Sequence, residues 1–421
     1  MTKIVIIGCS VVGMNMAYFL QEVGFRDIKI IEKRFKFTRE QTVSIRHDLF
    51  FKFIPLEVIK RLKNKCFIEN VSSSINYKCN DTDVFGQVSV VELRVLEELY
   101  YNFIQKQKHI TVIHSKSVEF SKDNIEIDTK EKIYYDILIG ADGVNSSTRK
   151  EFFGNRIKKS FPYNKFFGGY FKFKIKKFTK SHKKKDSTEE QNLIRGFPTK
   201  NQDTYTINLI LSKKQYEDTR GKGVSAIGKE LNNITDFFNL NLKSKEPIDY
   251  SVFPINLFYS KDFSKYNKKT KKYYYLVGDS AFPAHFMTGL GLNNGLTASV
   301  MLAGILRCSE NPVKEYNNQM KILSERNRVM IAYSIIRYKK IIQKCKNKKT
   351  EKYLIKQNFK HLNNDQVCLY LSRMIDKDYY DKIHNFKKYI TEMRYLECFS
   401  TKVKKQYISY LYPDELGLVS L

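Results

Sequence analysis

The 421-residue sequence contains no tryptophan and only seven cysteines, no two of which form a C-x-x-C pair. This spacing indicates neither a disulfide framework nor a zinc site, so we expect no bound metal. No window offers the roughly 18 consecutive apolar residues of a transmembrane helix. The opening segment MTKIVIIG has the pattern of a strand, so we expect no secretory signal. These absences predict a soluble protein of a reducing compartment, the cytoplasm.

Acidic residues are few beside basic ones, with 44 Asp plus Glu against 74 Lys plus Arg and a formal net charge of +30. Such an excess can attract nucleic acid, an anionic membrane or an acidic filament. The lysines are scattered along the chain, however, and the densest run, Lys183 to Lys185, is typical of a solvated loop. We therefore interpret the charge as compositional and expect no specific nucleic-acid partner.

The first thirty residues have the pattern strand, glycine turn, helix, strand. Ile4 to Ile7 and Ile28 to Ile31 are apolar runs of strand length, and the segment between them has apolar residues at helical spacing. Further apolar strands follow at Ile137 to Ile139 and at Tyr273 to Val277. Strands that alternate with helices favour an α/β fold with a Rossmann-like domain.

The middle of the chain has a different pattern. Between about Phe161 and Phe258, short alternating runs separated by polar turns predict a mainly antiparallel sheet. A helical pattern follows from Asn293 to Leu306, and the chain after Asn311 is helical and Lys-rich. We predict a discontinuous α/β domain of residues 1–155 and 270–310, an inserted β domain of residues 156–269 for the substrate, and a helical C-terminal region of residues 311–421.

A glycine turn follows the first strand. In Gly8-Cys9-Ser10-Val11-Val12-Gly13, the first glycine can make the tight turn and the last can allow close helix-strand packing, while the helix N-terminus faces a pyrophosphate. Ser10 stands where the second glycine of G-x-G-x-x-G would be. Glu32 ends the next strand, where an acid accepts hydrogen bonds from an adenosine ribose. The predicted dinucleotide contacts are Gly8, Ser10, Val11, Val12, Gly13, Glu32, Lys33 and Arg34.

A second segment follows the strand at Ile137 to Ile139. Asp142, Gly143, Ser146 and Arg149 match D-G-x-x-S-x-x-R, so this segment resembles the FAD-dependent aromatic hydroxylases, the family of the p-hydroxybenzoate, kynurenine and ubiquinone-pathway monooxygenases. The resemblance implies that Asp142 and Gly143 lie near the dinucleotide and that Arg149 offers a charge to phosphates or to a nicotinamide donor. Taken alone, the segment is also explained by a plain Asp-Gly turn.

A third segment resembles the G-D-A-A stretch of that family and its downstream G-x-G-x-N. It consists of Gly278 and Asp279, then Gly289-Leu290-Gly291-Leu292-Asn293. The resemblance implies that Asp279 accepts hydrogen bonds from the ribityl chain and that the later turn offers N–H groups to the flavin. The predicted contacts in this segment are Gly278, Asp279, Gly289, Gly291, Leu292 and Asn293.

Three further positions are candidates by resemblance. The stretch from Phe85 to Arg94 is similar to the one that opens a long helix beside the flavin, where relatives, including the MICAL actin-oxidising monooxygenases, often have an arginine. Val90 or Val91 stands at that place here, so the candidates in this stretch are Gln87 and Arg94. Arg46 lies where relatives have an arginine that approaches the flavin, although an ordinary surface charge explains it equally well.

Three positions depart from the family pattern. Its histidine after G-D-A-A corresponds to Phe282, its proline before G-x-G to Phe286, and the aspartate of the following helix to Ala298. These departures predict that flavin binding is retained while oxygen activation becomes leaky.

The resemblance implies FAD as cofactor, NAD(P)H as reductant, and transfer of one oxygen atom from O2 to a small aromatic substrate. No second G-x-G-x-x-G is present, so the donor would bind transiently against the flavin. The absence of tryptophan disfavours a tryptophan halogenase. Two alternatives stay open: a flavin reductase or oxidase on the same fold, and a degenerate FAD-binding module with a basic interaction surface.

Overall fold

The structure, a computed structural model, describes residues 1–46, 53–70, 87–121, 123–128, 130–154, 157–159, 166–176, 195–198, 203–237, 240–284, 289–324 and 327. Its largest sheet has six strands in the order β17-β18-β10-β1-β2-β6. These strands are β1 (Lys3–Ile7), β2 (Asp27–Glu32), β6 (Ile110–His114), β10 (Ile137–Gly140), β17 (Ser264–Asn267) and β18 (Lys272–Leu276).

Five of the six strands are parallel, and β17 is antiparallel to β18. Ile4 of β1 is paired with Ile28 of β2 on one side and with Ile137 of β10 on the other. The chain leaves β1 toward β2 and later enters β10 on the opposite side, so β1 lies at a switch point of the sheet. In open α/β sheets, ligands bind at the carboxyl ends of the strands at such a point.

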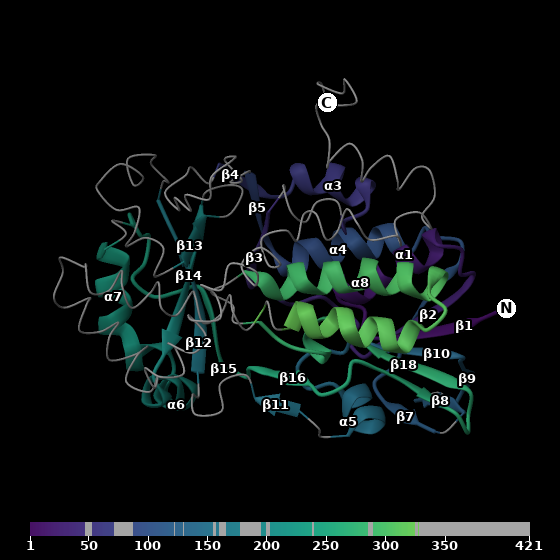
Figure 1. Cartoon of the computed structure of the whole chain (residues 1–421). Helices are drawn as coiled ribbons and strands as arrows, with labels where there is room; N and C mark the ends of the chain where they lie inside the picture. The colour runs from purple at the N-terminus through teal and green to yellow at the C-terminus, as the bar shows by residue number, and fades with distance from the viewer. Residues whose placement is uncertain are drawn as a thin grey trace, which may run out of the picture.

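Both faces of the sheet are buried. On β1, Ile4 and Ile6 belong to the core on one face, whereas Val5 and Ile7 belong to a second core on the other. The first face carries α1 (Val11–Glu22), α4 (Leu93–Ile104) and α8 (Leu290–Cys308), and the second carries α5 (Ser147–Phe153) with a small sheet of β7 (Val118–Phe120), β8 (Asn124–Ile127) and β9 (Lys132–Tyr134) (Figure 1).

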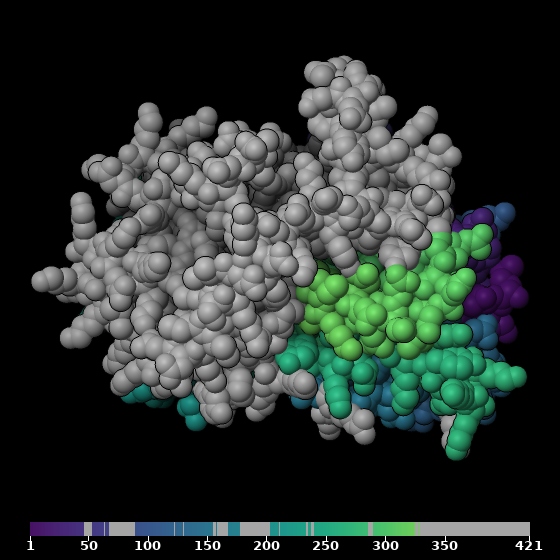
Figure 2. Space-filling model, in the orientation of Figure 1, coloured from purple at the N-terminus to yellow at the C-terminus, as the bar shows by residue number. Residues whose placement is uncertain are grey.

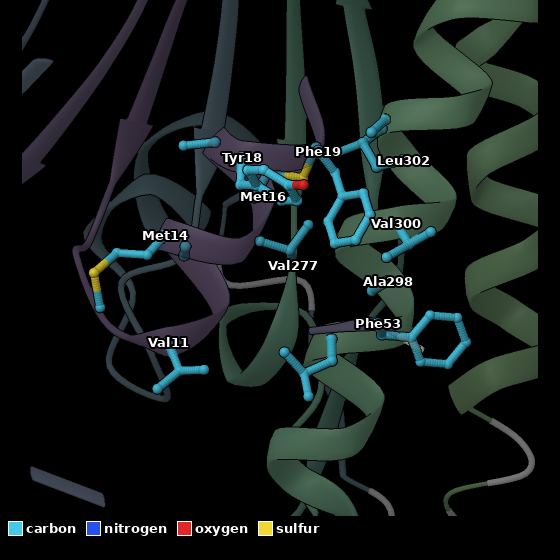
Figure 3. Packing of buried hydrophobic residues seen from close by; sticks show 14 of the residues in the cluster. Val11, Met14, Met16, Tyr18, Phe19, Phe53, Val277, Ala298, Val300 and Leu302 are labelled. Atoms are coloured by element: carbon cyan, nitrogen blue, oxygen red, sulfur yellow. The ribbon is translucent and has the colours of Figure 1, made fainter. Parts of the chain in front are cut away.

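Helices α1 and α8 pack against each other over the first face. Figure 3 shows Phe19 of α1 beside Val300 and Leu302 of α8, all of which are buried. At the surface, the green residues near the end of the described chain lie beside the purple N-terminal segment, although the two are far apart in sequence (Figure 2).

A second sheet has the order β13-β14-β12-β15 and is antiparallel throughout, as the alternating pattern of the middle segment predicts. A helical stretch within this segment is a departure from the expectation of mainly sheet. Phe171 and Phe173 of β12 form a core with Ile227 and Leu231 of these helices. The elements are β12 (Phe166–Lys174), β13 (Arg195–Pro198), β14 (Thr204–Leu211), β15 (Asp249–Ile255), α6 (Lys213–Lys222), η4 (Val224–Ile227) and α7 (Gly228–Phe237).

The remaining described elements connect these parts. They are α3 (Leu56–Lys63), η5 (Gly278–Ser280), a three-stranded sheet of β3 (Thr42–Arg46), β5 (Gln87–Glu92) and β4 (Phe67–Asn70), and the pair β11 (Ile157–Lys159) and β16 (Phe258–Ser260).

The chain beyond α8 is described only in part. Residues 312–324 form a helix, and the rest of the predicted helical C-terminal region lies outside the described residues apart from residue 327. Neither Cys9 nor Cys66 is disulfide-bonded, whereas Cys308 is, which the cysteine spacing does not predict. Among the helices that the structure describes, none combines the length and apolarity needed to cross a bilayer.

Candidate dinucleotide site

The glycine turn after β1 is too tight for side chains. Gly8 has a φ of +106°, and a Cβ atom there would stand 2.5 Å from the carbonyl oxygen of Ala141, which follows β10. A Cβ atom at Gly13 would stand 2.0 Å from the Gly8 carbonyl oxygen. The Ser10 side chain makes no capping hydrogen bond at the start of α1, so the leading N–H groups of this helix are available to an anion.

Glu32 ends β2 beside this turn and is 3% exposed. Its carboxylate accepts hydrogen bonds from the Cys9 N–H at 2.7 Å and from Arg34 Nε at 3.0 Å. Burial by itself raises the pKa of Glu32, but the bonds from Arg34 and Cys9 outweigh it and hold this pKa below its ordinary value. The acid is therefore ionised and fixed next to the helix N-terminus.

Two glycines, one in the third segment and one in helix α8, allow these parts of the chain to pack closely against the glycine turn after β1. A Cβ atom at Gly278 would stand 3.2 Å from Val12 Cγ1, and one at Gly295 of α8 would stand 2.4 Å from Val12 Cγ2. Asp279 lies beside Gly291, where an added Cβ atom would be 3.8 Å from Asp279 Oδ1. The packing thus joins the carboxyl ends of β1 and β18 and the start of α8.

Asp279 is exposed, yet protein surrounds it closely enough that desolvation raises the pKa of its carboxyl to about 6, with Arg39 opposing that shift. Gly289, with a φ of +64°, precedes α8, and Asn293 Nδ2 donates to its carbonyl oxygen at 2.6 Å. Asn293 is buried, and its Oδ1 atom has no hydrogen-bond partner among the described residues.

The second segment forms a structural turn. The Asp142 carboxylate accepts from Ser146 Oγ at 2.5 Å and from the Thr148 N–H at 3.0 Å, so it caps α5. Arg149 is 5% exposed and donates to the carbonyl oxygens of Ser280 at 2.7 Å and Val144 at 2.8 Å. Both bonds hold the Arg149 guanidinium against the backbone, and its role toward phosphates or a nicotinamide donor stays a prediction.

Arg149 also lies over the Phe258 ring, at 4.4 Å from the ring centroid. Its guanidinium therefore ties the turn after β10 to the turn after β18. Gly143, with a φ of +78°, has no heavy atom within 4 Å of an added Cβ, so only its backbone conformation requires glycine.

The remaining predicted contacts differ from one another in their exposure to solvent. Val11 is buried in the core, Leu292 packs partly against it, and Lys33 is exposed. Arg46 and Gln87 end β3 and begin β5, where Arg46 is paired with Val88, but their side chains lie outside the described residues.

Two residues of the site were missed by sequence analysis. Glu97 of α4 is 0% exposed, and its Oε1 atom lies 3.6 Å from Arg34 Nη2 and 3.8 Å from Arg39 Nη1. No local motif marks either Glu97 or Arg39, because α4 and the loop after β2 meet only in the folded chain.

Two of the departures from the family pattern are core residues. Phe282 is 3% exposed with its ring edge-on to Phe263, and Ala298 is 1% exposed on α8 (Figure 3). Both side chains thus pack in the core, and the predicted effect of these departures on oxygen activation stays a prediction. Phe286 lies outside the described residues.

A surface cavity of about 540 Å³ lies elsewhere, beside α5 and β8, with Phe120, Glu151 and Tyr274 among its lining residues. None of the predicted contacts lines it, so we assign the site from the packing at the strand ends. Among the described residues, no group of three or more His, Cys, Asp or Glu side chains is placed to hold a metal ion.

The residues present fit a dinucleotide. The glycine cradle excludes side chains from the turn, Glu32 is held beside it, and Asp279 and the unpartnered Asn293 oxygen lie at the other end. The α/β fold with its parallel sheet thus brings the predicted dinucleotide contacts of the first and third segments together at the strand ends.

The chain is similar in sequence to flavin-dependent monooxygenases. The chain is 27% identical over 168 residues to an FAD-dependent monooxygenase of Apiospora sacchari, a match that covers 35% of this chain and 34% of that protein. It is 27% identical over 183 residues to an FAD-dependent monooxygenase of Metarhizium robertsii, covering 38% and 54%. These relatives confirm the resemblance to FAD-dependent monooxygenases, and the chain matches about a third to a half of their length. No family model matches the chain.

Solved structures share the fold. The flavin-dependent halogenase CmlS superposes with a TM-score of 0.63 at 13% identity, over 98% of this chain and 77% of the halogenase. PqsL of P. aeruginosa, in complex with 2-aminobenzoylacetate, gives 0.57 at 14% identity, over 79% and 94%. The mixed α/β fold with a parallel sheet is therefore that of flavin-binding proteins.

Proposed function

We propose that this chain binds FAD and is a monooxygenase, passing one oxygen atom from O2 to a small aromatic substrate with NAD(P)H as the reductant. The observation that carries the proposal is the packing of Gly278 and Gly295 against Val12, which joins the glycine turn, Asp279 and the start of α8 in one site. The relatives named FAD-dependent monooxygenases support the same activity.

Each end of the site has a distinct task in this proposal. Glu32, held ionised by Arg34 and Cys9, accepts hydrogen bonds from the adenosine ribose. The N–H groups at the start of α1 face the pyrophosphate. Asp279 accepts from the ribityl hydroxyls, and the turn at Gly289 offers backbone groups to the ring system. When bound, FAD supplies electron transfer and oxygen activation, while these residues orient it and limit the access of water.

The substrate would lie against the polar face of the second sheet. Phe171 points into the core with α6 and α7, so Tyr170 and Lys172 lie on the opposite face of β12. Lys172 Nζ donates to Glu92 Oε1 at 2.7 Å and to Glu40 Oε2 at 3.1 Å. Because Glu40 and Glu92 belong to the segments between β2 and α4, these bonds place this face of β12 next to the α/β part of the chain. The 2-aminobenzoylacetate held by PqsL is an aromatic compound, which supports an aromatic substrate here.

The reductant has no binding motif of its own in the sequence, so we propose that NAD(P)H binds transiently against the bound flavin. We also propose that oxygen activation is leaky, as the departures at Phe282, Phe286 and Ala298 predict; Phe282 and Ala298 are buried in the core.

The experiment is to load the purified protein with FAD and follow NADH and NADPH consumption in air over a panel of phenols, anilines and indoles. Product should contain one oxygen atom from ¹⁸O2, and hydrogen peroxide should measure any uncoupled turnover. Donor oxidation without oxygen in any product would favour a reductase or oxidase. If neither donor reduces the flavin, the proposed activity is wrong.

A further inference from the structure

Arg39 lies between the two ends of the cofactor site. Its backbone is fixed, because its carbonyl oxygen accepts from the Arg94 N–H at the start of α4 at 2.8 Å. Its side chain is 44% exposed, with Nη1 3.8 Å from Glu97 Oε1. Its charge also acts on Asp279, where it lowers the pKa against the larger opposing effect of desolvation. One guanidinium thus influences an acid beside the glycine turn and an acid at the end of β18.

Three acids and two arginines, Arg34 and Arg39, lie around this site. Glu32, Glu97 and Asp279 are all acids, and a pyrophosphate would add two further negative charges. The N-terminus of α1 contributes only about half of a positive charge. A diphosphate therefore requires a cation with free surface in this space.

Arg39 is the cation that meets this requirement. Arg34 is committed to Glu32, with its Nε at 3.0 Å and its side chain 24% exposed. The Arg39 guanidinium, by contrast, makes only a long ion pair with Glu97 and, within the described residues, no hydrogen bond. It retains its donors for a ligand.

Glu97 explains why Arg39 points into the site. The carboxylate is fully buried, and neither of its oxygens has a hydrogen-bond partner among the described residues. Burial raises the pKa of Glu97, and Arg39 and Arg34 act in the opposite direction. The carboxylate is covered by protein and cannot itself touch a ligand, so its effect is exerted through the arginines.

We propose that Arg39 binds the pyrophosphate of the dinucleotide and that Glu97 is the positioning residue that holds the Arg39 guanidinium toward it. The inference rests on the proposed binding of FAD. It adds one contact residue and one positioning residue to the site.

The test uses FAD, ADP and adenosine as probes of the purified full chain, with dissociation constants from fluorescence or calorimetry. Arg39→Met should weaken FAD and ADP binding about 10- to 100-fold, the effect of one charge-assisted bond, and leave adenosine binding within about 2-fold. Lys36→Met is the matched control, since it removes an exposed cation from the same segment, and it should change none of the three by more than about 2-fold.

Glu97→Gln tests the positioning role in a double-mutant cycle. It should weaken ADP binding about 3- to 10-fold when Arg39 is present and have no effect in the Arg39→Met background. Circular dichroism confirms folding, and Glu97→Asp replaces Glu97→Gln if the latter does not fold. Equal losses in both backgrounds would contradict the positioning role.

Two failures are distinguishable. If the wild-type chain binds FAD and ADP and Arg39→Met binds them equally well, the assignment of Arg39 is wrong while the proposed function stands. If the wild-type chain binds neither FAD nor ADP, the proposed function itself is wrong.

Discussion

Gly295 of α8 lies directly against Val12 of α1, so closely that a Cβ atom at Gly295 would stand 2.4 Å from Val12 Cγ2. Val12 lies within the turn from Gly8 to Gly13, and Gly295 lies in α8 just after Asn293. The contact therefore sets the distance between the two halves of the cofactor site, and a single methyl group is enough to change it.

Gly295→Ala should lower the free energy of unfolding by about 1 to 3 kcal/mol, because valine is stiff and the two helices must separate. FAD affinity should fall with it. Gly221→Ala is the matched control: nothing lies within 4 Å of its added Cβ in α6, so it should be neutral or stabilising by up to about 1 kcal/mol. Denaturant unfolding measures the stability of both variants. If the double variant Gly295→Ala/Val12→Ala recovers the stability that Gly295→Ala loses, the clash between the two side chains is confirmed. An unchanged Gly295→Ala protein would contradict it.

Asp279 should make FAD binding depend on pH. Its pKa in the folded protein is raised to about 6, mainly by desolvation, and the ionised form is the better acceptor for ribityl hydroxyls. Affinity should therefore be highest above pH 6 and fall as the pH is lowered through 6. Asp279→Asn, which cannot ionise, should bind more weakly and show no such step. A step of equal size in Asp279→Asn would assign the titration to another group.

The same raised pKa has a consequence for the protein without cofactor. Between the ordinary value of 3.8 and about 6, the folded protein binds a proton at Asp279 that the unfolded chain releases. The contribution of this residue to stability is therefore greatest below that window and is lost as the pH rises through it.

Arg149→Met should destabilise the protein rather than remove a phosphate contact. It leaves the carbonyl oxygens of Ser280 and Val144 without the donors they have now, at a cost of about 2 to 4 kcal/mol. Lys150→Met, at the exposed neighbouring position, should be within about 0.5 kcal/mol of the wild type. A stable Arg149→Met protein with lost ADP affinity would restore the phosphate-binding role expected from the sequence.

Binding to duplex DNA should be weak and should fall steeply with salt, because the +30 charge is scattered and no recognition motif is present. Titrations of two unrelated duplexes at low and physiological salt measure this. A complex that survives physiological salt with one duplex and not with the other would contradict the compositional interpretation.

The site residues at the carboxyl ends of β1 and β2 could be predicted from the sequence because the patterns that mark them are local. The run from Ile4 to Gly13 and the acid at Glu32 lie within one βαβ unit, where spacing alone determines which residues meet. The antiparallel sheet was visible for the same reason in the alternation around β14. Helices α6 and α7 were missed, and α6 has little apolar periodicity of its own.

Other features of the site depend on contacts between distant segments. Arg149 is part of a sequence motif, but two of its contacts lie outside that motif. The Ser280 carbonyl and the Phe258 ring belong to segments that follow the second sheet and lie far from Arg149 in the sequence. Arg39 and Glu97 belong to no motif at all. Their relationship follows from the position of α4 beside the loop after β2, which no spacing in the sequence expresses.

The most direct test of the central claim is the flavin content of the purified protein, measured by its absorption spectrum together with FAD titration of the wild type and of Asp279→Ala. The wild type should show flavin bands in the near-ultraviolet and blue. Asp279→Ala should lose about one to two decades of FAD affinity, the effect of a charge-assisted hydrogen bond of roughly 1.5 to 3 kcal/mol. A wild-type chain without flavin bands that takes up no added FAD, or an Asp279→Ala variant that retains FAD in full, would contradict the account.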